Sequence, residues 1–224
     1  MPRRGSRSDS ARGAATVAAC TLAGGSAEFI AFDVCDEAGW QAATVAIVAA
    51  HGRLDAVINS AGIFSSKSFP DTSLAEFRAL WEADVTSVVL GTKWAMRTMR
   101  DTACAGSIVN VSSLAGLIGL EDCVAYCAAK AAVTHFSKIA AVEAGAFNPP
   151  VRVNSLNPGV IYTEMITGAY GDNDAVRAFC MDGNALAVVG EARHVAAAAS
   201  YLAGPRARFV TGTTLTVDGG RGSD

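Results

Sequence analysis

Residues 107–113 read SIVNVSS, a short apolar run followed at once by two serines. A run of this length favours a buried strand over residues 107–111. Downstream, residues 124–145 follow a helical pattern, and residues 151–156 form a second apolar run that ends in Asn157-Pro158-Gly159. Strand, helix and strand in this order are typical of a parallel sheet whose faces are covered by helices.

The same alternation continues toward both ends of the chain. Ser73 and Glu76 form a capping box, which predicts a helix that runs to about Met99, and Gly52 marks the end of an earlier helix. The other predicted elements are strands over 27–34, 54–58 and 213–217 and helices over 40–51 and 192–203. Together they predict an α/β fold with a doubly wound parallel sheet, in which ligands bind beyond the carboxyl ends of the strands.

Composition narrows the class of protein. The chain has 224 residues, is 51% hydrophobic and 17% charged, and carries a net charge of −3. A chain of this length can bury its core within one domain. A mildly acidic net charge gives no excess of basic residues to attract nucleic acid. No apolar stretch reaches the roughly 18 residues that a membrane span needs. The six cysteines form no Cys-x-x-Cys pair and have no histidine at zinc spacing, which indicates buried thiols in a reducing, cytoplasmic setting and no metal site.

The first residues differ from the rest of the chain. Residues 1–12 hold four arginines and lack the apolar segment of a secretory signal. We expect a loose Arg- and Ser-rich arm over residues 1–12, followed by a single domain over residues 13–224.

Tyr126 and Lys130 carry the strongest chemical signal. Residues four apart on a helix share a face, so the phenol and the ammonium group lie side by side. A free tyrosine has a pKa of about 10, and a neighbouring cation lowers that pKa toward the range useful for acid–base work. Ser113, just past a predicted strand, supplies a hydroxyl that can hold the oxygen of a carbonyl or an alcohol.

These residues stand in order with other motifs. The set comprises Leu54-Asp55, Asn59-Ser-Ala-Gly62, Asn110-Val-Ser-Ser113, Tyr126 with Lys130, Asn157-Pro-Gly159 and Val217-Asp-Gly-Gly220. In this order the motifs resemble the short-chain dehydrogenase/reductase family of Rossmann-fold enzymes over about residues 13–220. Within that family the chain is similar to bacterial hydroxysteroid and secondary-alcohol dehydrogenases.

The resemblance implies a role for each matching residue. Tyr126 would exchange a proton with the substrate oxygen, Lys130 would lower the pKa of Tyr126 and hold the nicotinamide ribose, and Ser113 would orient the substrate oxygen. The cofactor would be NAD or NADP, with NAD favoured by the resemblance alone, and it would carry the hydride. The residues implied in cofactor binding, from the adenine to the nicotinamide end, are Asp33, Val34, Asn59, Ala61, Gly62, Val111, Tyr126, Lys130, Pro158, Gly159, Ile161 and Thr163.

The chain departs from the family pattern near its start. The Gly-rich turn that holds the pyrophosphate has no match, and Gly24-Gly25 is interpreted as the end of a helix. We therefore expect an N-terminally truncated, Rossmann-like sheet without its first strand–helix–strand unit, which also removes the residue that selects NAD or NADP. The alternative function is a truncated, cofactor-free pseudoenzyme that serves as an interaction or structural protein.

Asp84 stands where the family usually has asparagine, a residue that the resemblance places in a proton relay with the lysine. Helical spacing puts Asp84 on the same face as Leu80 and Val88, so we expect it to point inward. There it can pair with Lys130, and without a partner it would be protonated.

Residues 160–190 correspond to the substrate lid of the family. Met165, Tyr170 and Phe179 give this segment apolar walls, which suit a hydrophobic ketone or secondary alcohol such as a steroid. The resemblance also implies a homodimer or homotetramer that associates through the helices of residues 74–99 and 124–145 and the C-terminal strand.

Overall fold

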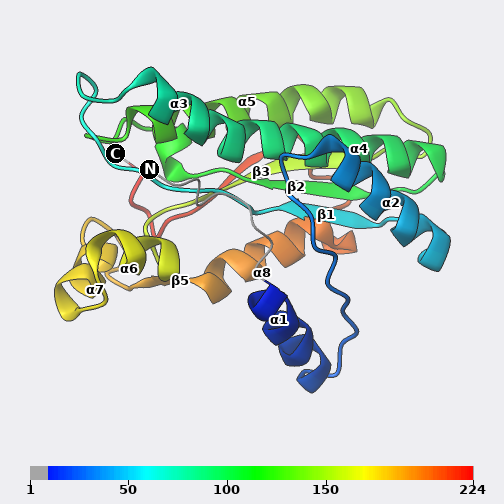
Figure 1. Ribbon diagram of the computed structural model, residues 1–224, viewed down its shortest axis with the longest axis horizontal. Helices are drawn as coiled ribbons and strands as arrows, with labels where there is room; N and C mark the ends of the chain where they lie inside the picture. Colours follow the sequence, from blue (N-terminus) through cyan, green and yellow to red (C-terminus); the bar gives the residue numbers. More distant parts are fainter. Residues whose placement is uncertain (1–9, 224) are drawn as a thin grey trace.

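A four-stranded parallel sheet forms the centre of the structure, a computed structural model that describes residues 10–223 (Figure 1). Its strands, in spatial order, are β1 (Ala56–Asn59), β2 (Ser107–Val111), β3 (Arg152–Pro158) and β6 (Thr214–Val217). A separate ladder joins β4 (Ile161–Tyr162) to β5 (Gly190–Glu191). The sheet confirms the predicted α/β fold with parallel strands.

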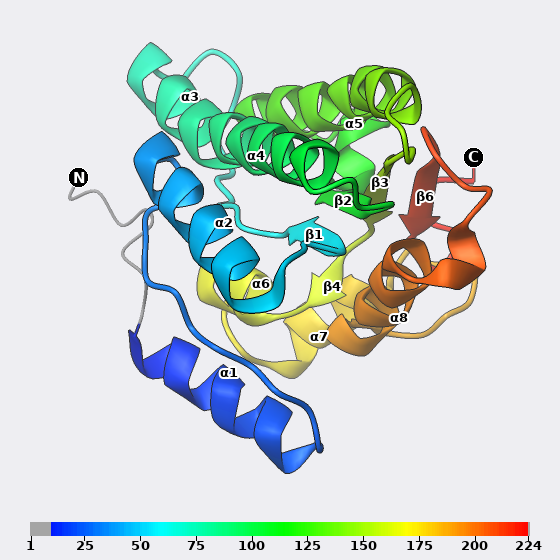
Figure 2. The ribbon, with the colours of Figure 1, turned by 90° about the vertical axis from the view of Figure 1, so that its right-hand side faces the viewer.

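Helices cover both faces of this sheet. α3, α4 and α5 lie on one face, and α8 lies on the other (Figures 1 and 2). A π-helical turn, Glu82–Thr86, joins α3 to α4 within the predicted helix of residues 73–99. The helices are α1 (Ser10–Leu22), α2 (Glu37–His51), α3 (Leu74–Trp81), α4 (Ser87–Asp101), α5 (Val124–Gly145), α6 (Glu164–Tyr170), α7 (Asp174–Met181) and α8 (Ala192–Ala203).

Consecutive residues of the central strand β2 point to opposite faces, and both faces are buried. Ile108 packs in one cluster with Met99 and Val153, on the side of α4 and α5. Val109 packs in another cluster with Leu156 and Leu202, on the side of α8. A strand buried on both faces reads as a continuous apolar run, which is why the sequence alone located β2.

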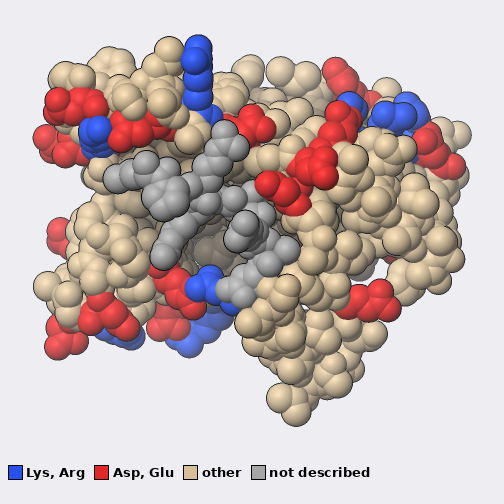
Figure 3. All heavy atoms as spheres, viewed as in Figure 1, with Lys and Arg blue, Asp and Glu red and all other residues tan. Residues whose placement is uncertain are grey.

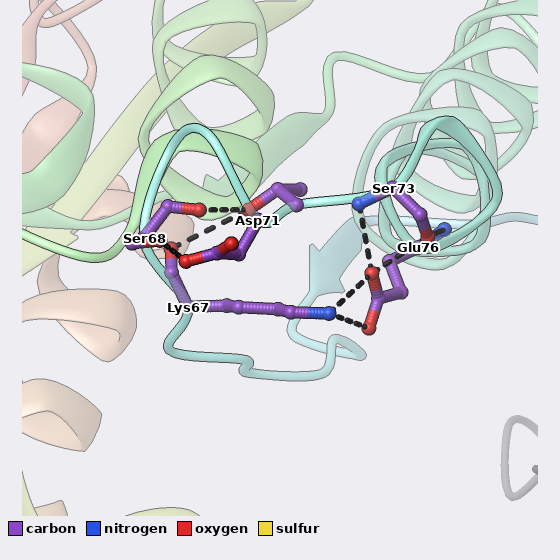
Figure 4. A network of polar contacts seen from close by, with 6 residues as sticks. Lys67, Ser68, Asp71, Ser73 and Glu76 are labelled. Atoms are coloured by element: carbon purple, nitrogen blue, oxygen red, sulfur yellow. Dashed lines mark hydrogen bonds and ion pairs between the residues drawn. The ribbon is translucent and has the colours of Figure 1, made fainter.

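The loop between β1 and α3 is fixed at two points. Ser73 and Glu76 form the predicted capping box, and Lys67 pairs with Glu76 at 2.9 Å (Figure 4). The hydrogen bond from Ser73 and the contact with Lys67 lower the pKa of Glu76 to about 2. The backbone N–H of Lys67 also donates to the carbonyl of Asp122 at 2.5 Å, just before α5. The loop is therefore held against the start of α5.

Residues 27–34 do not form the predicted strand. Within the described residues no strand lies beside them, and an extended segment can pair its N–H and C=O groups in a sheet only with such a neighbour. Phe32 instead packs edge-on against Trp40 with ring centroids 5.1 Å apart, and Phe29 and Ile30 stay more than 40% exposed. The prediction was wrong because a strand depends on a partner as well as on apolar residues.

The first described residues are helical. Residues 1–9 of the predicted arm lie outside the described residues, and its last three residues, Ser10–Arg12, begin α1. Gly24 has a φ of +81°, and the N–H of Gly25 bonds to the carbonyl of Cys20. This geometry confirms that Gly24-Gly25 ends a helix.

Charged side chains are interspersed on the face drawn in Figure 3, where Lys and Arg alternate with Asp and Glu. Within residues 10–223 no helix is both long and apolar enough to cross a bilayer. In the same part of the chain no three His, Cys, Asp or Glu side chains gather as metal ligands.

Candidate active site

A cavity of about 1060 Å³ opens at the carboxyl ends of the parallel strands, where ligands bind in sheets of this kind. It extends from the strand ends to α6, α7 and α8. The sequence-predicted residues that line it are Gly62, Val111, Ser113, Tyr126, Lys130, Pro158, Gly159, Ile161 and Thr163. Residues far apart in the sequence are thus brought to one place.

Ser113 and Tyr126 meet where β2 ends and α5 begins. Ser113 caps a 3-10 turn, and its hydroxyl accepts a hydrogen bond from the N–H of Ala115 at 3.1 Å. Tyr126 lies in the first turn of α5, and the nearby Ser113 side chain lowers the pKa of its phenol. Phe64 packs edge-on against the Tyr126 ring, with centroids 5.1 Å apart. A phenol and a hydroxyl therefore face the same cavity.

Lys130 lies one turn further along α5 and is buried. Its Nζ atom is 3.1 Å from Oδ2 of Asp84, 3.5 Å from the carbonyl oxygen of Val111 and 5.5 Å from the centroid of the Tyr126 ring. The ammonium group is thus closer to the carboxylate than to the phenol ring.

Asp84 comes from the π-helical turn and is fully buried, as its predicted inward direction requires. Its Oδ1 atom accepts a hydrogen bond from the N–H of Ile63 at 2.7 Å. A Cβ added to Gly62 would lie 3.1 Å from Oδ2 of Asp84, so the backbone passes tightly over the ion pair. Burial raises the pKa of Asp84 above its usual value, and the Lys130 ammonium and the Ile63 amide oppose that rise.

The phenol of Tyr126 is less acidic than a free tyrosine. Burial raises its pKa to about 12, and the Ser113 side chain offsets only part of the rise. The negative charge of Asp84 raises the pKa further, and Asp84 also neutralises Lys130. We expected Lys130 to lower the pKa of Tyr126. In the structure this pKa is raised instead.

A buried polar network ties the two halves of the site together. Oγ1 of Thr134 lies 2.7 Å from Oγ of Ser112 and 3.0 Å from Nδ2 of Asn157. The Ser112 hydroxyl donates to the carbonyl of Lys130 at 2.7 Å, and the Asn157 amide donates to the carbonyl of Ser113 at 2.8 Å. The network therefore fixes the backbone of Ser113 relative to that of Lys130.

Thr134→Val should lower the free energy of unfolding by about 1–3 kcal/mol, because it deprives the buried Ser112 hydroxyl and Asn157 amide of a partner. The kcat should fall as well, since Ser113 and Lys130 lose their shared anchor. Thr134→Ser keeps the hydroxyl and should retain most of the stability. Denaturant unfolding measures the difference, and equal losses in the two variants would contradict this role of the hydroxyl.

The sequence is similar to dehydrogenases along most of its length. The family profile described as Enoyl-(Acyl carrier protein) reductase matches residues 7–221. The cyclopentanol dehydrogenase of Comamonas sp. (strain NCIMB 9872) is 41% identical over 197 residues, which cover 88% of this chain and 77% of the relative. The NADP-dependent (R)-specific alcohol dehydrogenase of Lentilactobacillus kefiri is 34% identical over 192 residues, which cover 86% of this chain and 75% of that relative.

A solved structure with the same fold is the short-chain type dehydrogenase/reductase from Mycobacterium marinum. It has a TM-score of 0.84 at 29% identity, and the match covers 92% of this chain and 80% of that one. The chain belongs to the short-chain dehydrogenase/reductase family. Because its relatives are named dehydrogenases, this short-chain dehydrogenase/reductase is an oxidoreductase with a Rossmann-like fold, and the pseudoenzyme alternative is not favoured.

Four residues that the family resemblance assigned to the cofactor do not line the cavity. Asn59 turns inward, where its amide donates to Oδ1 of Asn110 at 2.8 Å and so links β1 to β2. Asp33 accepts a hydrogen bond from the N–H of Cys35 in the turn before α2. The four are Asp33, Val34, Asn59 and Ala61. The structure therefore places these four residues outside the cavity lining of this short-chain dehydrogenase/reductase.

Three further residues of the site escaped the sequence analysis. Phe64, which follows β1, and Arg221, which follows β6, line the cavity, and Thr134 on α5 supports it through the polar network described above. No spacing pattern links residues from such distant elements, and only the position of Phe64, two residues after Gly62, gave a local signal.

Proposed function

We propose that the chain transfers a hydride between a nicotinamide cofactor and a hydrophobic ketone or secondary alcohol, with Tyr126 exchanging the proton at the substrate oxygen. The observation that carries the proposal is the meeting of Ser113, Tyr126 and Lys130 around one cavity at the carboxyl ends of the strands. A phenol and a hydroxyl aimed at the same space can hold and protonate one oxygen atom.

Tyr126 is suited to donate a proton. With a pKa of about 12 its phenol is neutral at pH 7, so it can protonate a carbonyl oxygen as that oxygen gains negative charge. Ser113 holds the same oxygen through its hydroxyl. The reverse reaction, oxidation of the alcohol, needs the phenolate, so its rate rises with pH up to the pKa of Tyr126.

The cavity fits the nicotinamide end of the cofactor. Pro158, Gly159 and Thr163 line it together with Lys130, and these residues supply hydroxyl, backbone and ammonium groups for a ribose and a carboxamide. Bound there, the nicotinamide would supply or accept the hydride. This donor set supports these residues, with Gly62, Val111 and Ile161, as the nicotinamide site.

The lid supports a hydrophobic substrate. Met165, Ile166, Tyr170 and Phe179 line the cavity, and such walls favour a cyclic or branched carbon skeleton. The names of the relatives, cyclopentanol and (R)-specific alcohol dehydrogenase, support the same class. We propose NAD as the preferred dinucleotide, on the resemblance to secondary-alcohol dehydrogenases, although the Lentilactobacillus relative is NADP-dependent.

Titration of the protein with NADH and NADPH, followed by fluorescence, tests the proposal together with a turnover assay on cyclic secondary alcohols. We expect saturable, micromolar binding of at least one dinucleotide, tighter for NADH, and formation of reduced nicotinamide with the alcohols. The absence of binding at millimolar dinucleotide, with no turnover, would overturn the proposal.

We also propose a cytoplasmic homodimer or homotetramer. Val89 on α4 and Ile139 and Val142 on α5 are apolar yet 43%, 52% and 79% exposed, which supports association through these helices. The six free cysteines support a reducing compartment. Light scattering measures the mass in solution, and a monomer would contradict the proposed assembly. Cell fractionation tests whether the protein is in the cytoplasm.

A further inference from the structure

The cavity has an aromatic wall that starts at Tyr126. Ring centroids are 5.1 Å apart for Tyr126 and Phe64, 6.1 Å for Phe64 and Tyr170, and 6.0 Å for Tyr170 and Phe179. All four residues line the cavity, and Tyr170 and Phe179 remain nearly half exposed there. The apolar body of a substrate can therefore lie along these rings with its reacting carbon at Tyr126.

Arg221 stands at the far end of this wall. It belongs to the turn after β6, and its guanidinium carbon lies 5.6 Å from the centroid of the Phe179 ring. One of its N–H groups donates to the carbonyl of Asp182, just past α7. Arg221 lines the same cavity as Tyr126. The cavity therefore has a phenol at one end of the aromatic wall and a guanidinium group at the other.

The guanidinium charge is not matched by a carboxylate within residues 10–223. Two other charged residues line the cavity: Lys130, which is paired with Asp84, and Glu121, which forms no ion pair with Arg221. A guanidinium has five N–H donors in a planar fork that matches a carboxylate, and the carbonyl of Asp182 uses one of them. Beside apolar rings, where water is partly displaced, such a charge attracts an anion more strongly than on open surface.

We infer that Arg221 binds a carboxylate group of the substrate. The inference rests on the proposed function and narrows it to a hydroxy acid or keto acid with an apolar ring or chain between its two polar ends. The alcohol carbon lies at Tyr126, the apolar body lies along Phe64, Tyr170 and Phe179, and the carboxylate lies at Arg221. The reaction moves a hydride and a proton at the alcohol carbon and leaves the carboxylate unchanged.

A kinetic comparison tests the inference. The probes are a series of secondary alcohols in which an apolar ring skeleton or chain of increasing length separates the alcohol carbon from a carboxylate, together with the methyl esters of the same compounds. We expect kcat/KM to favour the acid over its ester by about tenfold to a hundredfold, the effect of one charge-assisted contact. Arg221→Gln should remove this preference by raising the KM for the acid much more than the KM for the ester. Arg221→Lys should keep part of the preference.

A binding measurement separates this inference from the proposed function. Calorimetry with cyclohexanecarboxylate needs no turnover, and we expect binding by the wild type that Arg221→Gln loses. Arg208→Gln is the matched control, because Arg208 is exposed and lies outside the cavity. Equal carboxylate binding by wild type and Arg221→Gln, or an unchanged preference for the acid, would overturn the inference while alcohol turnover upholds the proposed function. Carboxylate binding without any turnover would uphold the anion site and count against the proposed function.

Discussion

Tyr126→Phe is expected to lower kcat by about 10²–10⁴-fold, the usual contribution of a positioned acid–base group. The substitution removes one oxygen atom and keeps the ring that packs against Phe64 at 5.1 Å. Binding of the reduced dinucleotide should change little, because Lys130, Gly159 and Thr163 are untouched. Steady-state kinetics with parallel dinucleotide titration measures both quantities.

Tyr170→Phe is the matched control for this variant. It removes a phenol hydroxyl from the same cavity, two rings further along the wall, without touching Ser113 or Lys130. It should therefore keep kcat within a small factor of the wild type. Undiminished turnover in Tyr126→Phe would refute the role of Tyr126, and a comparable loss in Tyr170→Phe would point to general damage of the cavity.

Asp84→Asn is expected to shift the pH profile of alcohol oxidation to lower pH by about one unit, the lower end of the effect of a nearby charge. Oxidation needs the phenolate, and the charge of Asp84 raises the pKa of Tyr126. Removing that charge also frees Lys130, 3.1 Å away, to stabilise the phenolate. At neutral pH the oxidation rate should rise by up to about tenfold, since each unit of pKa changes the phenolate fraction tenfold.

The asparagine keeps an oxygen that can accept from the N–H of Ile63, so the turn should hold its shape. Glu82→Gln is the control, because it makes the same change of charge on an exposed residue of the same π-helical turn. An unchanged profile in Asp84→Asn, or an equal shift in Glu82→Gln, would contradict this account. Thermal unfolding checks that Lys130 tolerates the loss of its partner, since a buried charge without one is costly.

The parts of the fold that the sequence predicted are those whose signal is local. β2 and α5 were located at their observed bounds because an apolar run and a helical pattern are visible within a few turns of chain. Residues 27–34 have the same apolar character, yet they lack the neighbouring strand that would make them part of a sheet. No property of those eight residues could have revealed that.

The candidate site also has features that follow from local sequence and features that depend on distant elements. The phenol and ammonium of Tyr126 and Lys130 are four residues apart, so the helix alone brings them together. The pKa of that phenol could not be predicted, because it depends on burial and on the charge of Asp84. Asp84 belongs to the π-helical turn between α3 and α4, far from Tyr126 in the sequence. Phe64 and Arg221 likewise reach the cavity only through the packing of distant elements.

The π-helical turn makes the site depend on the number of residues in this helix pair. Each residue of a regular α-helix turns the chain by about 100°, so eight residues overshoot two full turns by about 80°. The wider turn at Glu82–Thr86 takes up that excess, and Leu80, Asp84 and Val88 are all buried. Deleting a single residue there would swing α3 around the axis of α4 by about one residue's rotation. The direction in which Asp84 points toward Lys130 thus depends on the number of residues between α3 and α4. A conservative replacement of one side chain would leave that number unchanged.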